Sequence, residues 1–171
     1  MRVLAKSWSG VLVLGLLLGG GVALHAADYP LMAQAAPDFA LRAFSGDNVR
    51  LSEHRGEVVL LAFWSSRCST CSAQLAALNR TYLTYRSAGL QVYGISVEAE
   101  EPRAREFADA RHVAFPMLFD PAEEVSRQYD IDRLPTLILV DRNGTIRDVQ
   151  RDFSARDQAL YLHELRGLLN E

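Results

Sequence analysis

The amino-acid sequence predicts an α/β sandwich, in which helices lie on both faces of a mixed central sheet. Short apolar runs with the length of buried strands alternate along the chain with stretches of helical periodicity. This alternation favours parallel strands that are joined by helical crossovers. Near the C-terminus, Asp141-Arg142-Asn143-Gly144 separates two strand-like runs, and its Asn-Gly pair suits the positive φ angles of a hairpin turn. A hairpin adds an antiparallel pair, so the sheet is expected to be mixed.

Each expected strand is an apolar or alternating run that ends at turn residues. The run over 58–64, VVLLAFW, has the composition of a strand that is buried on both faces. The turn at 45–48, SGDN, separates the first two short strands. In chain order, the expected strands cover residues 36–41, 49–51, 58–64, 90–97, 115–119, 136–140 and 145–149.

The other long stretches have the periodicity of helices. The longest helix follows the strand over 58–64, and its apolar positions are Leu75, Leu78, Tyr82 and Tyr85. Gly89 is expected to end this helix, because glycine is common just after a helix C-terminus. The last helix is expected to place four leucines on one side, namely Leu160, Leu165, Leu168 and Leu169. In chain order, the expected helices cover residues 69–87, 101–111, 121–129 and 154–169.

The start of the chain has the pattern of an export signal. Basic residues precede an apolar run over 11–18, and small residues follow it. We therefore expect residues 1–27 to be a signal peptide or an N-terminal membrane anchor, and residues 28–35 to be a tether. Residues 36–171 suit one domain with its own core. A net charge of -3 at pH 7 gives no basic footprint for nucleic acid.

The chemistry is concentrated in one short motif. The chain has two cysteines, and Cys68 and Cys71 form a Cys-x-x-Cys that follows an apolar strand and opens a helical pattern. At a helix N-terminus, unpaired amides and the helix dipole favour a thiolate at Cys68. We expect Cys71 one turn later on the same helix, within reach of the first sulfur. The motif therefore predicts thiol–disulfide exchange.

Other uses of a Cys-x-x-Cys fit this sequence less well. A zinc site needs further cysteines or histidines at ligand spacing, and the histidines of this chain are scattered singly. A c-type haem site needs a histidine where Ser72 stands. An inert structural disulfide that closes so small a ring would constrain little of the unfolded chain. We therefore expect no metal and no cofactor beyond a redox-active disulfide between Cys68 and Cys71.

Four segments resemble one known group when they are taken together. They are Ala36-Pro37-Asp38-Phe39, Phe63-Trp64 with Cys68-x-x-Cys71, the strand–helix region around 99–120, and Leu134-Pro135-Thr136 before the turn at 141–144. In combination they resemble the TlpA/ResA-type exported thioredoxin-like proteins, a branch of the redoxin group. The resemblance covers essentially all of residues 36–171. It implies a thioredoxin-like (redoxin) fold and the activity of a thiol–disulfide oxidoreductase.

The resemblance also implies roles for residues around the motif. Cys68 would be the exposed nucleophile, and Cys71 would be the buried resolving thiol. Pro135 would be a cis-proline that faces the dithiol, and Leu134 would offer backbone groups to an extended client segment. Trp64 would pack beneath the active-site helix.

Two departures from the family pattern remove acids that would move a proton to or from the buried thiol. Ala62 stands where thioredoxins carry an aspartate, and Gln74 stands where ResA-like proteins carry a glutamate. Glu98, just past a buried strand, and Gln74 itself are the candidates for a proton relay. The positive charge of Arg67 is expected to favour the thiolate of the neighbouring Cys68.

The residues leave the direction of exchange open, whereas the resemblance favours a reductant of exported proteins or apocytochromes. Such a protein would take electrons from a membrane thiol transporter, serve cytochrome c maturation, act as a monomer and bind no nucleic acid. It would work in the periplasm or another extracytoplasmic space, either tethered or soluble after signal-peptide cleavage.

Three alternatives to a reductant remain. A thiol peroxidase is the first, since Ser65 matches the hydroxyl of a peroxiredoxin motif, although Leu61 stands where that motif has a proline. A redox-inert module that binds client chains is the second. The third is an oxidase or isomerase that donates disulfides.

Overall fold

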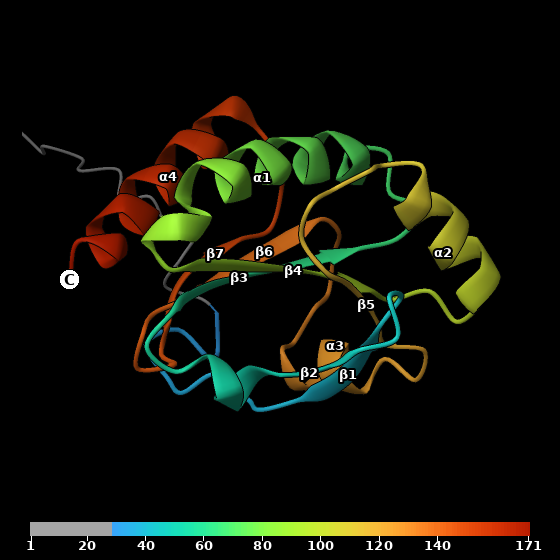
Figure 1. Cartoon of the computed structure of the whole chain (residues 1–171), viewed down its shortest axis with the longest axis horizontal. Coiled ribbons are helices and arrows are strands. Elements are labelled where there is room, and N and C mark those ends of the chain that lie inside the picture. Colours follow the sequence, from blue (N-terminus) through green and yellow to red (C-terminus); the bar gives the residue numbers. More distant parts are fainter. Residues whose placement is uncertain (1–28) are drawn as a thin grey trace, which may run out of the picture.

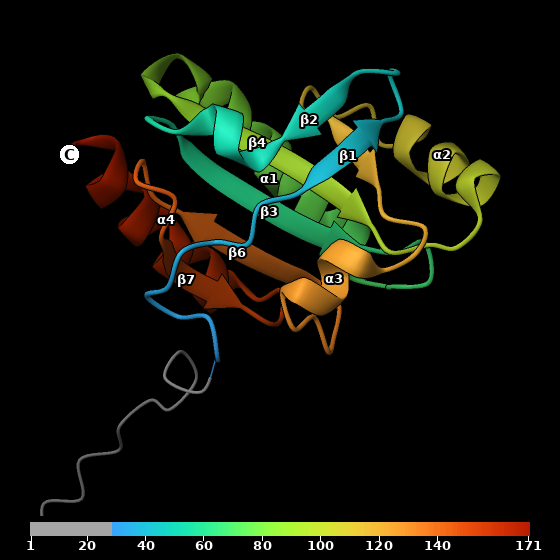
Figure 2. The ribbon, with the colours of Figure 1, turned by 90° about the horizontal axis from the view of Figure 1, so that it is seen from below.

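The computed structural model describes residues 29–171, which form a mixed sheet between layers of helices (Figures 1 and 2). The strands are β1 (Ala40–Ala43), β2 (Asn48–Arg50), β3 (Val58–Trp64), β4 (Leu90–Ser96), β5 (Met117–Phe119), β6 (Thr136–Val140) and β7 (Ile146–Gln150). Their order across the sheet is β2-β1-β5-β4-β3-β6-β7. The neighbours β3, β4 and β5 run parallel, and the other neighbouring pairs are antiparallel. The expected mixed sheet is thus confirmed, and the expected signal or anchor over 1–27 lies outside the described residues.

The helices divide between the two faces of the sheet. They are α1 (Cys71–Tyr85), α2 (Glu101–Asp109), α3 (Glu124–Gln128) and α4 (Ala155–Leu169), with short 3-10 helices η1 (Leu51–His54) and η2 (Arg86–Ala88). Helices α1 and α4 lie side by side above the sheet in Figure 1, and α3 lies below it. One core cluster joins α1, α2 and α4 to the upper face and contains Trp64 and Cys71. A second cluster on the lower face contains Tyr29, Phe39 and Tyr129.

Several elements begin or end elsewhere than the sequence predicts. Strands β3 and β6 have the expected limits, because each is a run of fully buried residues. Strand β1 begins at Ala40 rather than at residue 36, since Ala36 donates its backbone N–H to the Gly144 carbonyl at 2.8 Å and so borders the hairpin. Helix α3 is shorter than expected, because the Asp120 carboxylate accepts the N–H of Ser126 at 2.9 Å and caps its first turn. Gly89 ends α1 and η2 as expected, in a left-handed conformation with φ of 93°.

Residues 29–35, expected to be a tether, pack on the domain instead. Tyr29 is buried, and its hydroxyl donates to the Tyr129 carbonyl at 2.6 Å. The Arg151 guanidinium lies 5.1 Å from the centre of the Tyr29 ring. Ile146 exchanges two backbone hydrogen bonds with this segment, of 3.0 and 2.9 Å. These partners are far away in the sequence, so the local composition of the segment does not reveal them.

Helix α4 faces the core with a different set of side chains than predicted. Leu165 and Leu168 are buried as expected, whereas Leu160 is 53% exposed. Tyr161 takes the inward position instead and is buried. The helical turn that places Leu165 and Leu168 inward also brings Tyr161 to the sheet, and it turns Leu160 to solvent.

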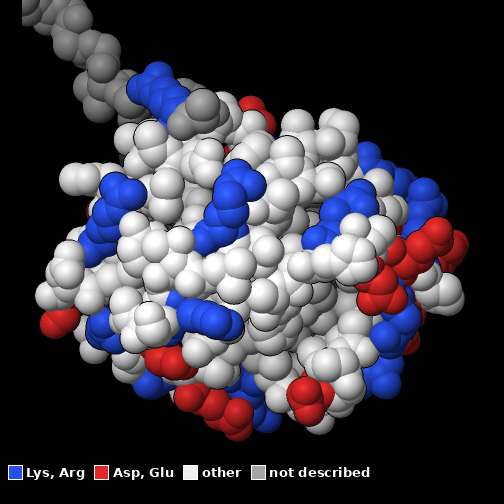
Figure 3. All heavy atoms as spheres, turned by 45° about the horizontal axis from the view of Figure 1, so that its top comes forward, with Lys and Arg blue, Asp and Glu red and all other residues white. Residues whose placement is uncertain are grey.

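The described residues on the surface over α1 and α4 form no continuous patch of one charge. In Figure 3 the basic side chains lie singly on a largely uncharged face, and the acidic side chains lie toward its margins. Within residues 29–171, no helix has the length and apolar character needed to span a membrane.

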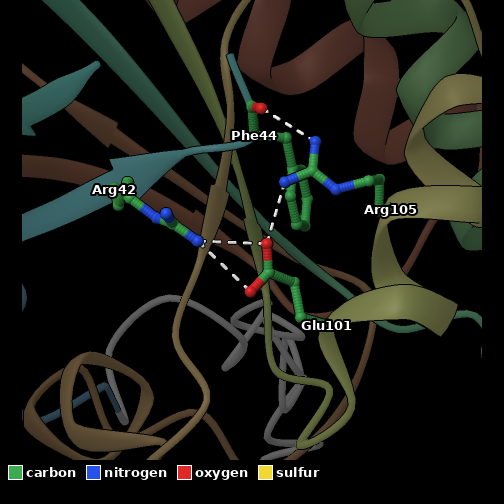
Figure 4. A network of polar contacts seen from close by, with 4 residues as sticks. All are labelled: Arg42, Phe44, Glu101 and Arg105. Carbon is green, nitrogen blue, oxygen red and sulfur yellow. Dashed lines mark hydrogen bonds and ion pairs between the residues drawn. The ribbon is translucent and has the colours of Figure 1, made fainter. Parts of the chain in front are cut away.

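Helix α2 is fixed to the edge of the sheet by a small polar network (Figure 4). Glu101, the first residue of α2, pairs with Arg42 of β1 at 3.1 Å and with Arg105 at 2.8 Å. Arg105 also donates to the Phe44 carbonyl at 2.9 Å, and its guanidinium lies over the Phe44 ring. Exposed ion pairs each contribute little to stability, but together these contacts define where α2 sits against β1.

Candidate active site

The two cysteines form a disulfide and differ in exposure. The Cys68 and Cys71 Cα atoms are 5.4 Å apart. Cys71 is completely buried in the core cluster, whereas Cys68 is half-buried and packs against the edge of the same cluster. Cys68 therefore lies nearer to the surface than Cys71 does.

The helix begins later than the sequence predicts. Cys71, not Cys68, is the first residue of α1, and Cys68 lies in the preceding turn. That turn is closed by a hydrogen bond from the Cys68 N–H to the Ser65 carbonyl at 3.1 Å, and the first bond of α1 runs from the Gln74 N–H to the Thr70 carbonyl. The first amides of α1 still have no partner within the helix, so its positive end lies beside the dithiol.

The register of the sheet brings three loops to the end where the dithiol lies. Trp64 at the end of β3 pairs with Ser96 at the end of β4, and Phe63 pairs with Thr136 at the start of β6. The loops that follow β3 and β4 and the loop that precedes β6 therefore meet at one end of the sheet. They carry the dithiol, Glu98 and Leu134-Pro135, respectively.

The Leu134–Pro135 peptide bond is cis, as expected. Pro135 is buried at the start of β6, while Leu134 is half-buried and packs against both core clusters. The hydroxyl of Thr136 donates to the Arg133 carbonyl at 2.8 Å and holds the loop from its other side. Leu134 thus lies at the surface of the same core that Cys68 borders.

Glu98 is buried and accepts several hydrogen bonds from the start of the dithiol loop. Its Oε1 accepts the Ser65 hydroxyl at 3.0 Å, the Ser66 N–H at 2.7 Å and the Ser66 hydroxyl. Arg103 of α2 donates to the Ser66 hydroxyl at 3.0 Å. Burial alone would raise the pKa of Glu98, but the hydrogen bonds from Ser66 and Ser65 and the charge of Arg103 lower it below its usual range. The carboxylate is therefore ionised at neutral pH.

Gln74 and Trp64 are buried beside the dithiol and keep unpaired polar atoms. Gln74 lies one helical turn after Cys71, and its Oε1 has no hydrogen-bond partner among residues 29–171. The same holds for Nε1 of Trp64. The Trp64 ring belongs to the core under α1, as expected, and it also stacks on Phe107 of α2 with ring centres 4.9 Å apart. Gln74 is thus close to the dithiol in sequence, but among residues 29–171 no hydrogen bond links its side chain to the dithiol turn.

Arg67 is exposed beside Cys68, and its side chain makes no ion pair within the described part of the chain. Its backbone N–H donates to the Ser65 hydroxyl at 3.2 Å. The sequence did not predict a contact for Thr70, whose hydroxyl lies 3.9 Å from the Cys68 sulfur and is placed to donate to it. A hydroxyl between the two cysteines is the signal in the sequence for such a contact.

Comparison with known proteins identifies the family. The model of the AhpC/TSA family matches residues 32–149. The thiol-disulfide oxidoreductase ResA of Geobacillus kaustophilus is 30% identical over 118 residues, which are 69% of this chain and 68% of the relative. The thioredoxin-like protein YneN of Bacillus subtilis is 33% identical over 118 residues, which are 68% of this chain and 69% of the relative.

Solved structures agree with these relatives. A Chlorobium tepidum protein described as a thiol:disulfide interchange protein DsbE superposes with a TM-score of 0.77 and 31% identity, over 81% of this chain and 97% of that chain. A Bacteroides thetaiotaomicron protein described as a protein disulfide isomerase gives a TM-score of 0.78 at 26% identity, over 84% and 93% of the two chains. The fold is therefore thioredoxin-like, as the resemblance implied. The chain belongs to the AhpC/TSA family and, within it, to the ResA-like thiol–disulfide oxidoreductases.

Proposed function

We propose that this oxidoreductase reduces disulfides of exported proteins, with Cys68 as the nucleophile and Cys71 as the resolving thiol. The unequal burial of the two cysteine residues is the observation that supports this division most directly. The S–S bond of a client disulfide must point at the attacking sulfur, and only Cys68 is exposed enough for such an approach. The positive end of α1 beside the dithiol favours the thiolate that this attack requires.

The reaction moves two electrons from the dithiol to the client. The Cys68 thiolate attacks one sulfur of the client disulfide, a bond forms between the two sulfurs, and the other client sulfur leaves as a thiolate that takes up a proton. Cys71, after losing its proton, then attacks the Cys68 sulfur and expels the second client thiolate. The client leaves reduced, and the Cys68–Cys71 disulfide remains. An external dithiol must reduce this disulfide before the next cycle.

Leu134 and Pro135 are the proposed contact for the client backbone. They border the dithiol in space because β6 starts beside the end of β3. Proline has no N–H, so Pro135 presents no donor toward the sulfurs, and the backbone groups of Leu134 can pair with an extended client segment. Arg67 and Thr70 would favour the Cys68 thiolate by charge and by hydrogen bonding, respectively.

The proposed place of action is the cell envelope, and the proposed clients include apocytochromes on the way to cytochrome c. The export pattern in residues 1–27 and the ResA-like relatives support this proposal. A membrane thiol transporter would be the source of electrons. Fractionation of cells that produce the full chain should place it outside the cytoplasm, and recovery in the cytosolic fraction would contradict the proposal.

A thiol peroxidase is the alternative that the family name raises. Leu61 stands where a peroxiredoxin has its motif proline, and it lies fully buried within β3. The ResA relatives that match at 30 and 31% identity are named for disulfide chemistry, and this favours exchange. Consumption of hydrogen peroxide by the reduced protein, at a rate similar to its reduction of a model disulfide, would support the peroxidase instead.

A trapping experiment tests the division of labour. In Cys71→Ser the second step is blocked, so this variant should accumulate mixed disulfides with client proteins through Cys68. In Cys68→Ser the remaining thiol is buried, so this variant should accumulate few. Equal trapping by both variants, or trapping by Cys68→Ser alone, would overturn the assignment.

The reduction potential tests the direction of exchange. Equilibration of the purified protein with glutathione buffers gives the potential directly. A value near or below that of thioredoxin, about -270 mV, supports a reductant. A value near that of DsbA, about -120 mV, would identify a donor of disulfides.

A further inference from the structure

We propose that Glu98 is a positioning residue for the exchange reaction, and that its carboxylate holds the Ser65–Cys68 turn in the conformation that presents the Cys68 sulfur. The proposal rests on the nucleophilic role of Cys68 in the proposed function, but not on the direction of exchange. It gives the loop after β4 a role in the chemistry, although that loop carries no group that reacts.

The contacts of Glu98 converge on one short segment of the dithiol loop. A single oxygen, Oε1, accepts from the Ser65 hydroxyl, the Ser66 N–H and the Ser66 hydroxyl. Hydrogen bonds to an ionised acceptor are roughly twice as strong as neutral ones. Ser65 and Ser66 lie 33 and 32 positions before Glu98 in the sequence. The contacts therefore fix the dithiol loop, which follows β3, to the loop that follows β4.

The constraint reaches Cys68 through the backbone. Ser65 accepts the Cys68 N–H with its carbonyl and the Arg67 N–H with its hydroxyl. The Ser65 hydroxyl therefore both donates to Glu98 and accepts from the turn that ends at Cys68. If Glu98 were removed, Ser65 and Ser66 would lose their buried acceptor, and the turn would lose its link to β4.

Arg103 completes the support from the opposite side. It reaches the Ser66 hydroxyl from α2, and the Phe107 ring of the same helix stacks on Trp64. Glu101 ties this helix to Arg42 of β1 (Figure 4). The dithiol loop thus lies between a buried carboxylate on the β4 side and a guanidinium on the α2 side. Both partners hold Ser66, and neither bonds to a cysteine in the described structure.

A positioning role fits Glu98 better than the proton relay that the sequence analysis considered. A relay must take up and release a proton near neutral pH. The hydrogen bonds and Arg103 keep the pKa of Glu98 below its usual range against the effect of burial, so the group stays ionised. The proton relay remains an untested hypothesis, and the experiment below distinguishes the two roles.

The test measures exchange at Cys68 without any client. We expect Glu98→Ala and Ser66→Ala each to slow the reaction of reduced protein with oxidised glutathione, and alkylation of Cys68 by iodoacetamide, by about tenfold. A misplacement of about 1 Å can cost about a hundredfold, and the turn keeps its own hydrogen bonds in these variants, so we expect a smaller effect. The double variant should be little slower than either single one, because both changes break the same link. Glu98→Gln keeps an acceptor of similar shape and should recover most of the rate.

The matched control is Asp141→Asn. Asp141 is also buried and accepts two backbone N–H groups, at 2.9 Å each, but it lies at the opposite end of the sheet. This variant should exchange at the parental rate even if it is less stable. If Glu98→Ala does not fold, Ser66→Ala and Arg103→Met test the same link through partially or fully exposed positions.

Three outcomes would overturn the proposal. The first is a parental exchange rate in both Glu98→Ala and Ser66→Ala. The second is full additivity of their effects in the double variant, which would mean independent roles. The third is a Glu98→Gln variant that is as slow as Glu98→Ala, which would show that the reaction needs an ionisable group at this position, as a proton relay does, and not only an acceptor. Failure of Cys68 to react with iodoacetamide in the parent protein would instead contradict the proposed function.

Discussion

Each end of the central sheet has a buried carboxylate that accepts hydrogen bonds from a turn, but the two carboxylates connect different parts of the chain. At the hairpin end, the buried carboxylate of Asp141 accepts the N–H groups of Asn143 and Thr145 and pairs with Arg147. At the dithiol end, the buried carboxylate of Glu98 accepts the N–H of Ser66 and two hydroxyls. Each carboxylate thus holds one turn against the sheet.

The difference lies in how far apart the joined residues are. Every partner of Asp141 named above is within six residues of it, so the hairpin turn is held by local contacts. Gly144 supplies the left-handed backbone conformation that this turn needs, with φ of 79°. The partners of Glu98 belong to a loop after another strand. Two buried polar atoms that have no hydrogen-bond partner within residues 29–171, on Trp64 and Gln74, also lie at this end. The hairpin end is therefore locally determined, whereas the geometry of the dithiol end depends on the whole fold.

The largest expected effect compares two core leucines. Leu75 lies on α1 one turn after Cys71, and Leu139 lies on β6 beside the hairpin; both are buried. Replacing either with alanine should lower the free energy of unfolding by about 2–5 kcal/mol, as measured by urea denaturation. Only Leu75→Ala should also slow glutathione exchange, because it loosens the packing around Cys71. Equal slowing by Leu139→Ala would show that the two ends are not independent.

A smaller effect is expected for the hairpin carboxylate. Asp141→Asn should lower the free energy of unfolding by about 1–3 kcal/mol, since the amide replaces an ionised acceptor of buried N–H groups. Thermal denaturation gives this change, and the exchange rate measured on the same sample should stay at the parental value. A slower exchange would contradict the local character of the hairpin end.

The next prediction restores a missing acid. In Gln74→Glu, burial should raise the pKa of the new carboxyl above the usual value of about 4.3. A carboxyl at this position can take the proton of the buried thiol, so the pH dependence of exchange should gain a second titration above the usual carboxyl pKa. An unchanged pH profile would mean that position 74 does not communicate with the dithiol.

The smallest expected effects concern how the stability of the fold depends on pH. The contributions of the Glu98 and Asp148 carboxyl groups should have opposite signs. The lowered pKa of Glu98 means that its carboxylate stabilises the fold above its unfolded pKa and that this contribution is lost as the pH falls. Burial raises the pKa of Asp148, and the charges of Glu164 and Asp157 raise it further. The hydrogen bond from Gln150 lowers this pKa only in part. Asp148 therefore destabilises the fold once it ionises.

The measurement is the melting temperature at pH 7 and at pH 3. Glu98→Gln should lower the melting temperature at pH 7, and Asp148→Asn should raise it by about 2 °C. Both differences should shrink at pH 3, where the parent groups are more protonated. Changes of the same sign in the two variants would contradict the assignment of the pKa directions.

The sequence predicted best those elements whose environment is uniform. The limits of β3 and β6 were correct, because short continuous apolar runs that end at turn residues are typical of strands buried on both faces. The hairpin was predictable from Asn143-Gly144, since its turn depends on local backbone conformation. The redox role of the Cys-x-x-Cys was predictable from its spacing and its position between a strand and a helix. The cis Leu134–Pro135 bond was predicted through the family resemblance, which rests on short motifs.

The sequence did not reveal what depends on distant partners. The packing of Tyr29 rests on Tyr129, 100 residues away, so a segment that looks like a tether is part of the domain. The start of α1 at Cys71 depends on the turn that closes on Ser65. The role of Glu98 as the acceptor for Ser65 and Ser66 could not be inferred from a carboxylate at a strand end, because such residues are usually solvated.

The attachment of α2 has a consequence for how related enzymes can diverge. Glu101 anchors this helix to the sheet edge, while Arg103 and Phe107 of the same helix contact Ser66 and Trp64. The reactivity of the dithiol can therefore be tuned from a segment that contains neither cysteine and leaves the motif intact. Transplanting residues 99–116 from a relative would test this directly: the glutathione exchange rate should move toward that of the donor protein, and an unchanged rate would show that the helix is only scaffolding.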